Sequence, residues 1–236
     1  MSLPEVVSRD EWLSVRKALL AEEKELTRRR DALNADRRRL PMVKIEKDYV
    51  FTGPDGEARL LDLFDGRLQL IVGHFMFDPD WEEGCPSCSA GADEVSDGLL
   101  DHLHARDTTL AYVSRAPLEK LERWKAKKGW RFPWYSSHAS DFNVDFHVTI
   151  DESVASPEYN YREGAQPGEY PGTSFFLRDG DDVFHTYSSY ARGAEQTGGS
   201  YYWLDLTALG RQEEWEEPRG RAASAHSAQP DFEDRR

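Results

Sequence analysis

The amino-acid sequence predicts an α/β fold with a mixed central sheet flanked by helices. Three observations support this prediction: an apolar run of strand length at residues 68–77, an alternation of strand and helix patterns up to residue 128, and a hairpin signal near residue 180. The 236 residues suffice for one such domain with additions, and the hydrophobic fraction of 39% is ordinary for a packed core.

A long charged helix is predicted at the N-terminus. Ser8 followed by Glu11 fits a capping box that starts this helix, and Pro41 ends it. Between them a narrow apolar stripe repeats every seven residues, formed by Trp12, Leu19, Leu26, Leu33 and Leu40. We interpret residues 1–41 as a helical extension. It packs by one edge on the following domain or forms a homodimer contact, and the sequence favours neither alternative.

The next elements alternate between strand and helix patterns. In chain order we expect a hairpin at 49–60 around the turn Gly53-Pro54-Asp55-Gly56, a strand at 68–77, a helix from 85 to about 105, a strand at 108–113 and a helix at 117–128. Pro86 suits the first turn of the first helix, and Leu121 and Trp124 share one side of the second.

Residues from about 130 to 170 are aromatic, with scattered Pro and Gly and no clear period, so we interpret them as an irregular insertion. A second hairpin follows, with strands at 173–177 and 183–187, and a last helix is expected at 204–211. From 213 to 236 the chain is charged with few large apolar groups, which predicts a disordered tail. The domain itself is therefore assigned to residues 42–212.

The order of these elements predicts the topology. The first two long strands would be parallel through a right-handed crossover, and the second hairpin would add antiparallel strands. Strand, helix, strand, helix, hairpin and helix is the order of the thioredoxin fold. We therefore predict a thioredoxin-like domain with an N-terminal helical extension and an insertion before the second hairpin.

The only two cysteines, Cys85 and Cys88, lie three positions apart where a strand gives way to a helix. A helix N-terminus carries partial positive charge and unpaired N–H groups, both of which stabilise a thiolate. We expect Cys85 to be the nucleophile and Cys88, one turn further, to be the resolving thiol. Three acidic residues just before the motif oppose thiolate formation, and the sequence leaves the net effect open; they are Asp80, Glu82 and Glu83.

Two other interpretations of the cysteine pair stay open. A structural zinc site would need ligands from His74, His102 or His104, the last two near the far end of the predicted helix. Alternatively, both cysteines are plain buried residues. No metal and no cofactor is predicted. His74 is either a core residue or a group that tunes the cysteines.

Residues around the motif are candidates for substrate contacts. Trp81 and Phe77 flank the dithiol and are interpreted as an apolar rim, with core packing as the alternative. Pro86 lies within the motif and is included with them. Pro171 precedes the first strand of the second hairpin and completes this set.

The composition argues against several classes of partner. The net charge of −14 would repel a nucleic-acid backbone or an anionic membrane surface. No apolar stretch is long enough to cross a bilayer, and the first residues lack the basic and apolar regions of a secretory signal. We expect a cytoplasmic protein without nucleic-acid or membrane partners.

Five stretches of the sequence are distinctive. They are Gly73–Phe77, Trp81–Ser89, Ser140–Asn143 with Asp145 and Phe146, Phe184–Tyr187 leading to Tyr190–Gly193, and Tyr202–Asp205 with Gly210 and Arg211. Together they resemble a bacterial thioredoxin-like family of unassigned function, often described as predicted dithiol-disulfide oxidoreductases. The resemblance implies that Pro171 is cis and faces the dithiol, where it would present backbone to an extended substrate. An ordinary trans proline in a turn is the alternative.

The function predicted from these features is that of a thiol–disulfide oxidoreductase acting on a protein or small-molecule disulfide with an unknown reductant. One alternative is a non-enzymatic binding module that uses the N-terminal helix and the aromatic residues from 187 to 203. Another is a peroxiredoxin-like thiol peroxidase, which would follow the pattern Pro-x-x-x-Thr/Ser-x-x-Cys. In that pattern Pro79 is one residue too near Cys85, and Glu82 stands where the hydroxyl should be.

Overall fold

The computed structural model describes residues 4–197, 199 and 206–207. Within these residues the chain divides at Pro41 into an N-terminal unit and a larger unit that begins at Met42. The predicted tail lies outside the described residues, and so does the predicted last helix apart from residues 206 and 207.

The N-terminal unit contains one helix, α1 (Arg9–Arg37). The Glu11 N–H donates to Ser8 Oγ at 3.3 Å, and the Ser8 N–H donates to Glu11 Oε2 at 2.9 Å. This reciprocal pair confirms the predicted capping box. No residue of α1 is buried. The role of the heptad stripe, in packing or in a homodimer, therefore stays a prediction.

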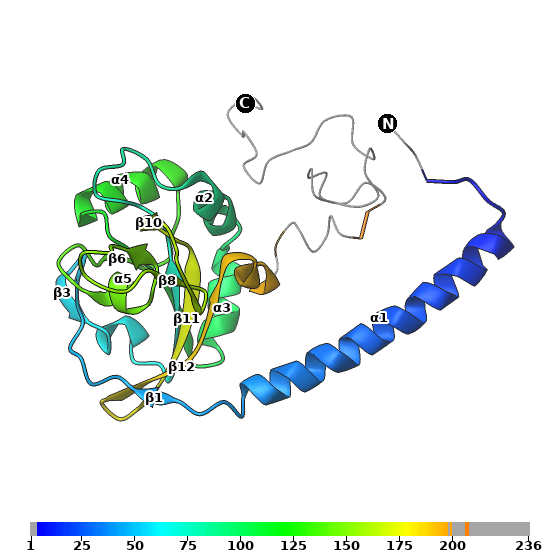
Figure 1. Ribbon diagram of the computed structural model, residues 1–236, viewed down its shortest axis with the longest axis horizontal. Helices are drawn as coiled ribbons and strands as arrows, with labels where there is room; N and C mark the ends of the chain where they lie inside the picture. The colour runs from blue at the N-terminus through cyan, green and yellow to red at the C-terminus, as the bar shows by residue number, and fades with distance from the viewer. Residues whose placement is uncertain (1–3, 198, 200–205, 208–236) are drawn as a thin grey trace. The chain divides into compact units, whose positions relative to one another are not determined.

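The larger unit is organised around one eight-stranded sheet (Figure 1). Its strands are β1 (Val43–Lys44), β2 (Val50–Gly53), β3 (Gly56–Arg59), β4 (Gln69–His74), β5 (Thr108–Ser114), β6 (Trp134–Ser136), β11 (Gly172–Asp179) and β12 (Asp182–Tyr190), in the spatial order β1-β12-β11-β4-β5-β6-β2-β3. β4 and β5 are parallel, and β11 is antiparallel to both β4 and β12. The order β12-β11-β4-β5 confirms the predicted thioredoxin-like topology.

Helices connect the strands. They are η1 (Asp62–Phe64), α2 (Pro86–Asp93), α3 (Asp97–His104), α4 (Leu118–Lys128), α5 (Phe142–Asp145) and η2 (Ala191–Thr197). The single helix expected from 85 to 105 is wrong, because α2 ends at Asp93 and α3 starts afresh. Ser96 explains the break, since its Oγ accepts the Leu99 N–H at 3.2 Å and caps a new helix start.

The prediction of an irregular insertion at 130–170 is wrong in part. β6 lies in the central sheet, parallel to β5, and is too short to show a strand period in the sequence. The remaining residues form α5 and two small sheets. These are β7 (Thr149–Ile150) with β10 (Gly168–Glu169), and β8 (Glu158–Tyr159) with β9 (Arg162–Glu163).

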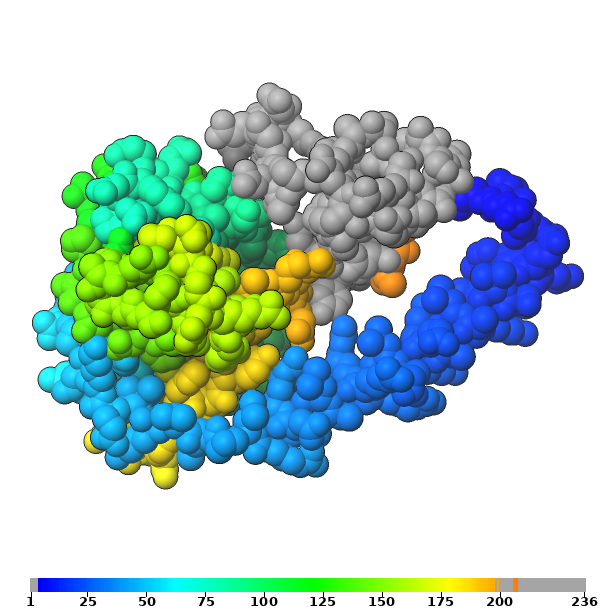
Figure 2. Space-filling model, viewed as in Figure 1, coloured from blue at the N-terminus to red at the C-terminus, as the bar shows by residue number. Residues whose placement is uncertain are grey.

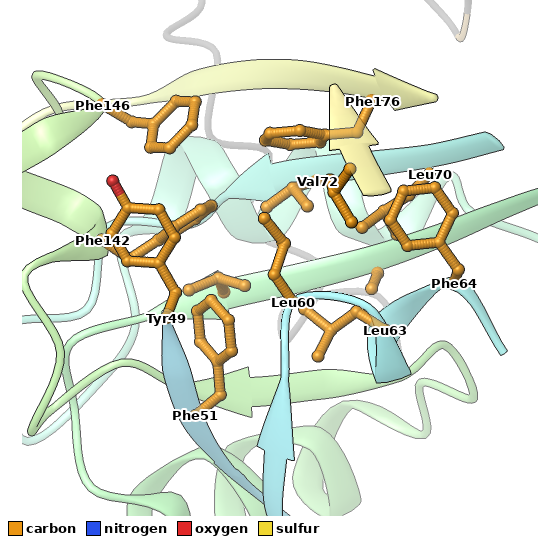
Figure 3. Packing of buried hydrophobic residues seen from close by; sticks show 13 residues of the cluster. Tyr49, Phe51, Leu60, Leu63, Phe64, Leu70, Val72, Phe142, Phe146 and Phe176 are labelled. Atoms are coloured by element: carbon orange, nitrogen blue, oxygen red, sulfur yellow. The ribbon is translucent and has the colours of Figure 1, made fainter. Parts of the chain in front are cut away.

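Two apolar clusters cover the two faces of the sheet. The first core cluster consists of Tyr49, Phe51, Leu60, Leu63, Phe64, Leu70, Val72, Ala111, Val113, Phe142, Phe146, Phe176 and Val183. Figure 3 shows its rings converging from β2, η1, α5 and β11, with Tyr49 and Phe51 each edge-on to Phe142 at 5.1 and 5.0 Å. The second core cluster consists of Phe75, Phe77, Ala92, Leu100, Leu110, Ala116, Leu121, Trp124, Trp130, Phe132 and Trp134, beneath α2, α3 and α4.

A chain of four polar side chains lies within the sheet beside the first core cluster. His74 Nε2 and Ser174 Oγ are 2.8 Å apart, Ser174 Oγ and Ser188 Oγ are 2.8 Å apart, and Ser188 Oγ lies 2.7 Å from His185 Nε2. His185 and Ser188 are three positions apart and would face opposite sides of a regular strand. The register shift between Phe175 and Phe176 brings them to one face.

Proton counting fixes the direction of this chain. Its three hydrogen bonds share two hydroxyl protons, so one histidine must donate. His185 also hydrogen-bonds the Tyr187 backbone, and His74 Nδ1 has no partner within the described residues. An unpaired buried acceptor costs less than an unpaired N–H, so His74 donates through Nε2 and His185 accepts. Burial lowers the pKa of His74 to about 3, which makes it a neutral core residue.

Breaking this chain should destabilise the fold. In Ser174→Ala, His74 and Ser188 lose a buried partner, and we expect a loss of about 1–3 kcal/mol in the free energy of unfolding. This loss is measured by urea unfolding, with tryptophan fluorescence as the signal. Ser189→Ala, a half-buried change on the same hairpin but outside the chain, is the control. Equal stability of the two variants would contradict the role assigned to Ser174.

Candidate active site

The two cysteines follow the loop that leaves β4. The Cys85 N–H donates to the Met76 carbonyl oxygen at 3.0 Å, which holds the start of α2 against the end of the strand. Gly84 makes this approach possible. A Cβ there would lie 2.8 Å from the Phe75 ring and 3.0 Å from the Trp124 indole nitrogen. The backbone can therefore reach this position only without a side chain at residue 84.

Cys85 is the N-cap of α2, and Pro86 occupies its first turn as predicted. The Cys88 N–H donates to Cys85 Sγ at 3.5 Å, and the Ser89 N–H donates to the Cys85 carbonyl oxygen at 2.9 Å. Both cysteines are free thiols and partly buried, whereas Pro86 and Ser87 are exposed. The capping sulfur thus lies at the accessible end of the helix.

The two thiols have opposite pKa shifts. The Cys88 side chain donates a hydrogen bond to Cys85, which is the main reason that the pKa of Cys85 is lowered to about 6. Backbone N–H groups of Cys88 and Ser87 add to this effect, and burial opposes it. The same side-chain hydrogen bond, with burial and the charge of Cys85, raises the pKa of Cys88. Near neutral pH the pair therefore holds one thiolate, on Cys85, and one thiol, on Cys88.

The acidic residues before the motif are largely paired with lysines. Glu83 lies 3.0 Å from Lys127 Nζ, and Glu82 lies 3.7 Å from Lys120 Nζ. Lys120 also donates to the carbonyl oxygens of Pro79 and Trp81, at 2.8 Å each. The sequence left open whether these carboxylates outweigh the helix terminus. The pKa of Cys85 is lowered in their presence, mainly by the Cys88 side chain and further by the backbone N–H groups of Cys88 and Ser87.

The predicted apolar rim is corrected at one position. Phe77 is 1% exposed and packs against Trp124 and Trp134 in the second core cluster, so it has no surface to offer a substrate. The loop after β4 turns inward there because the Ala116 N–H donates to the Phe77 carbonyl oxygen at 2.8 Å. Trp81 is 37% exposed and Pro86 is exposed, so a substrate contact through these two residues stays a prediction.

Two connections link the surroundings of Pro171 to those of the dithiol, and the prediction that Pro171 itself faces the cysteines stays a prediction. The residue after it, Gly172, is in register with His74 at the end of β4. The Tyr159 O–H donates to the Pro171 carbonyl oxygen at 2.8 Å, and the charge of Cys88 contributes to raising the pKa of Tyr159, after the larger effect of burial. Figure 2 shows the yellow-green residues of the insertion on the same face of the molecule as the turquoise residues that follow β4.

Sequence reasoning missed Tyr159, because nothing in an aperiodic aromatic segment distinguishes one tyrosine from another. Its ring lies 4.4 Å from that of Tyr170, and its hydroxyl accepts the Ala191 N–H at 2.8 Å. The insertion therefore contributes a fixed residue to the site.

A partly buried ion cluster was also missed. Arg115 lies 2.8 Å from Asp78, in the loop between β4 and α2, and 2.8 Å from Glu169, two residues before Pro171. Thr149 donates to Glu169 at 3.0 Å. Burial raises the pKa of Glu169 to about 7 against the opposing effects of Arg115 and Thr149. The cluster ties the cysteine loop to the segment that carries Pro171.

Within the described part of the chain, no group of three or more His, Cys, Asp or Glu side chains is arranged to hold a metal ion. His102 and His104 lie exposed on α3, a separate helix from the one that Cys85 starts. None of the helices described there is long and apolar enough to span a membrane.

Fold and site together define a thioredoxin-fold protein with a dithiol at a helix start. The chain belongs to the DUF899 family, described as bacterial proteins of unknown function, whose model matches residues 1–229. A comparison with curated proteins gives no match.

Solved structures similar to this chain include peroxiredoxins. The Xanthomonas campestris bacterioferritin comigratory protein, studied for alkyl peroxide reduction, is 13% identical, with 66% of this chain and 91% of that chain covered and a TM-score of 0.49. Peroxidoxin BcpB from Mycobacterium tuberculosis is 16% identical, with coverages of 66% and 92% and a TM-score of 0.45. A Plasmodium vivax 2-Cys peroxiredoxin is 16% identical, with coverages of 64% and 82% and a TM-score of 0.40.

The hydrogen bond from the Cys88 thiol should control the acidity of Cys85. In Cys88→Ala this donor is absent, so the pKa of Cys85 should rise from about 6 toward its ordinary value. Cys88→Ser keeps a donor and should retain most of the depression. The pH dependence of iodoacetamide alkylation measures both. If the two variants titrate alike, the thiol hydrogen bond is not the main cause.

Glu169 should make stability depend on pH near neutrality. Its folded-state pKa, about 7, lies above the unfolded value, so its contribution is full below about pH 4.5 and is lost as pH rises through 7. Between pH 5 and 8 the wild type should lose about 3 kcal/mol more unfolding free energy than Glu169→Gln. Chemical unfolding across this range tests it, with the exposed Glu163→Gln as control. Parallel curves for wild type and Glu169→Gln would contradict it.

Proposed function

We propose that this chain is a thiol–disulfide oxidoreductase in which Cys85 is the nucleophile and Cys88 the resolving thiol. The observation that carries the proposal is the position of Cys85 as the N-cap of α2, with the Cys88 N–H donating to its sulfur at 3.5 Å. The opposite pKa shifts of the two thiols, caused mainly by the side-chain hydrogen bond between them, agree with this arrangement. A nucleophile with a pKa near ambient pH is the most effective attacking thiol. A plain pair of core cysteines has no need of this asymmetry.

In the first step, the Cys85 thiolate attacks one sulfur of a substrate disulfide. The substrate S–S bond breaks, a mixed disulfide forms, and the first thiolate leaves and takes a proton. In the second step, Cys88 loses its proton and attacks the Cys85 sulfur. The second substrate thiol leaves, and the protein retains a Cys85–Cys88 disulfide after losing two electrons. An external dithiol reductant would restore the reduced pair.

The first step prepares the second. The pKa of Cys88 is raised mainly by its hydrogen bond to Cys85, with burial next and then the charge of Cys85. A mixed disulfide removes that charge and weakens that acceptor, so the pKa of Cys88 falls once Cys85 has reacted. The resolving thiol therefore stays protonated until a substrate is attached.

The reduction potential of the pair tests this function. Alkylation of residual thiols across a glutathione or dithiothreitol series should give one reversible two-electron transition between roughly −270 and −120 mV. Cys85→Ser should show no transition. Cys88→Ser should accumulate a mixed disulfide that Cys85→Ser does not form. If no internal disulfide forms under strong oxidant, the dithiol mechanism fails and a non-enzymatic binding module becomes the better interpretation.

A further inference from the structure

A polypeptide substrate that binds in extended form by strand addition needs free backbone groups beside the nucleophile. An extended peptide is held on a neighbouring segment by main-chain pairing, in which one residue of that segment offers both an N–H and a C=O. The segment that Arg115 and Tyr159 link to the surroundings of the cysteines is Tyr170–Pro171–Gly172. Its free donors and acceptors therefore decide whether a peptide has a place to bind.

None of these three residues offers such a pair. The Tyr170 N–H donates to the Val148 carbonyl oxygen at 2.8 Å. Pro171 has no N–H, and its carbonyl oxygen accepts the Tyr159 hydroxyl at 2.8 Å. Gly172 lies inside the sheet, in register with His74 on one side and Tyr190 on the other.

The residues that hydrogen-bond the backbone of this segment are themselves fixed by other contacts. Tyr159 packs against Tyr170 and Tyr190, with ring centroids 4.4 and 5.5 Å away, and accepts the Ala191 N–H. On the other side, β10 pairs with β7, which continues the hydrogen bond between Tyr170 and Val148. A peptide would have to displace several hydrogen bonds and ring contacts to pair here.

The cysteine motif offers no substitute. Pro86 has no N–H, and the backbone N–H groups of Ser87 and Cys88 are directed at the Cys85 sulfur. Among the described residues, those exposed beside Cys85 in the sequence include Pro86, Ser87 and part of Trp81, together with Glu82 and Glu83, whose carboxylates are paired with lysines. A substrate can be recognised here through its sulfur atoms and a small apolar contact.

We propose that the substrate is a low-molecular-weight disulfide and not a disulfide within an extended polypeptide; this inference rests on the thiol–disulfide activity proposed above. The reduced protein transfers two electrons from Cys85 and Cys88 to the small disulfide. That disulfide is released as two thiols, and the protein is left with an internal disulfide. Turnover requires a dithiol reductant, for which dithiothreitol serves in the assay.

The test compares two substrates with the same reacting bond. One is a blocked single cysteine joined by a disulfide to 2-mercaptoethanol. The other carries the same disulfide in the middle of an extended peptide with several residues on each side. For each of the two compounds, we measure the rate constant at which it oxidises the reduced full-length protein. This rate constant is divided by the rate constant for the reaction of dithiothreitol with the same compound, which corrects for the intrinsic reactivity of the disulfide. Cys85→Ser gives the background, and a thioredoxin that reduces polypeptide disulfides is the positive control.

We expect a slower normalised rate for the peptide, because its flanking backbone has nothing to pair with and must be accommodated beside a segment whose hydrogen bonds are already made; equal rates would contradict the exclusion of polypeptides. A peptide that reacts about tenfold faster or more would overturn the small-disulfide assignment and leave the oxidoreductase function standing. If neither compound oxidises Cys85 while the control thioredoxin reacts with both, the proposed function itself fails and the inference fails with it.

Discussion

The candidate active site depends on the hydrogen bonds that the Cys85 sulfur receives at the start of α2. A thiolate in a partly buried position is disfavoured by burial, so it must be compensated by donors already in place. These donors come from the first helical turn and from the Cys88 thiol, and they are aligned only if the helix starts at residue 85. The Cys85 N–H bond to Met76 and the absence of a side chain at Gly84 fix that start against the end of β4.

The sheet positions the start of α2, but the segment that carries Pro171 is held by further contacts outside the sheet. Pro171 lies just before β11, and its carbonyl oxygen is bound by Tyr159 from the insertion. Arg115 links Asp78 of the cysteine loop to Glu169 of the segment before Pro171. The Arg115 bridge therefore ties the loop after β4 to the segment before β11, and the Tyr159 hydrogen bond holds that segment on the insertion. The same hydrogen bond occupies the Pro171 carbonyl oxygen.

The parts of the structure with strong local signals could be predicted from the sequence. The Ser8 capping box, the Gly53–Gly56 turn and Pro86 at the start of α2 each depend on neighbours within a few residues. The break between α2 and α3 depends on Ser96, which caps a new helix instead of continuing the first one. Hydrophobic periodicity does not reveal this break. Phe77 was misjudged because nearness to the cysteines in sequence does not imply exposure, and the loop turns it into the core.

Contacts between distant residues explain the remaining misses. Arg115 and Glu169 are paired only because β5 and the end of the insertion meet in the fold, and neither residue stands out in its own segment. The same holds for the His74–Ser174–Ser188–His185 chain, which requires a register shift that a strand pattern does not encode. The insertion looked irregular because its segments pair over two or three residues at a time. Its contacts are nonetheless specific, since Tyr159 binds the Pro171 carbonyl oxygen and Glu169 is bridged through Arg115 to Asp78 in the cysteine loop.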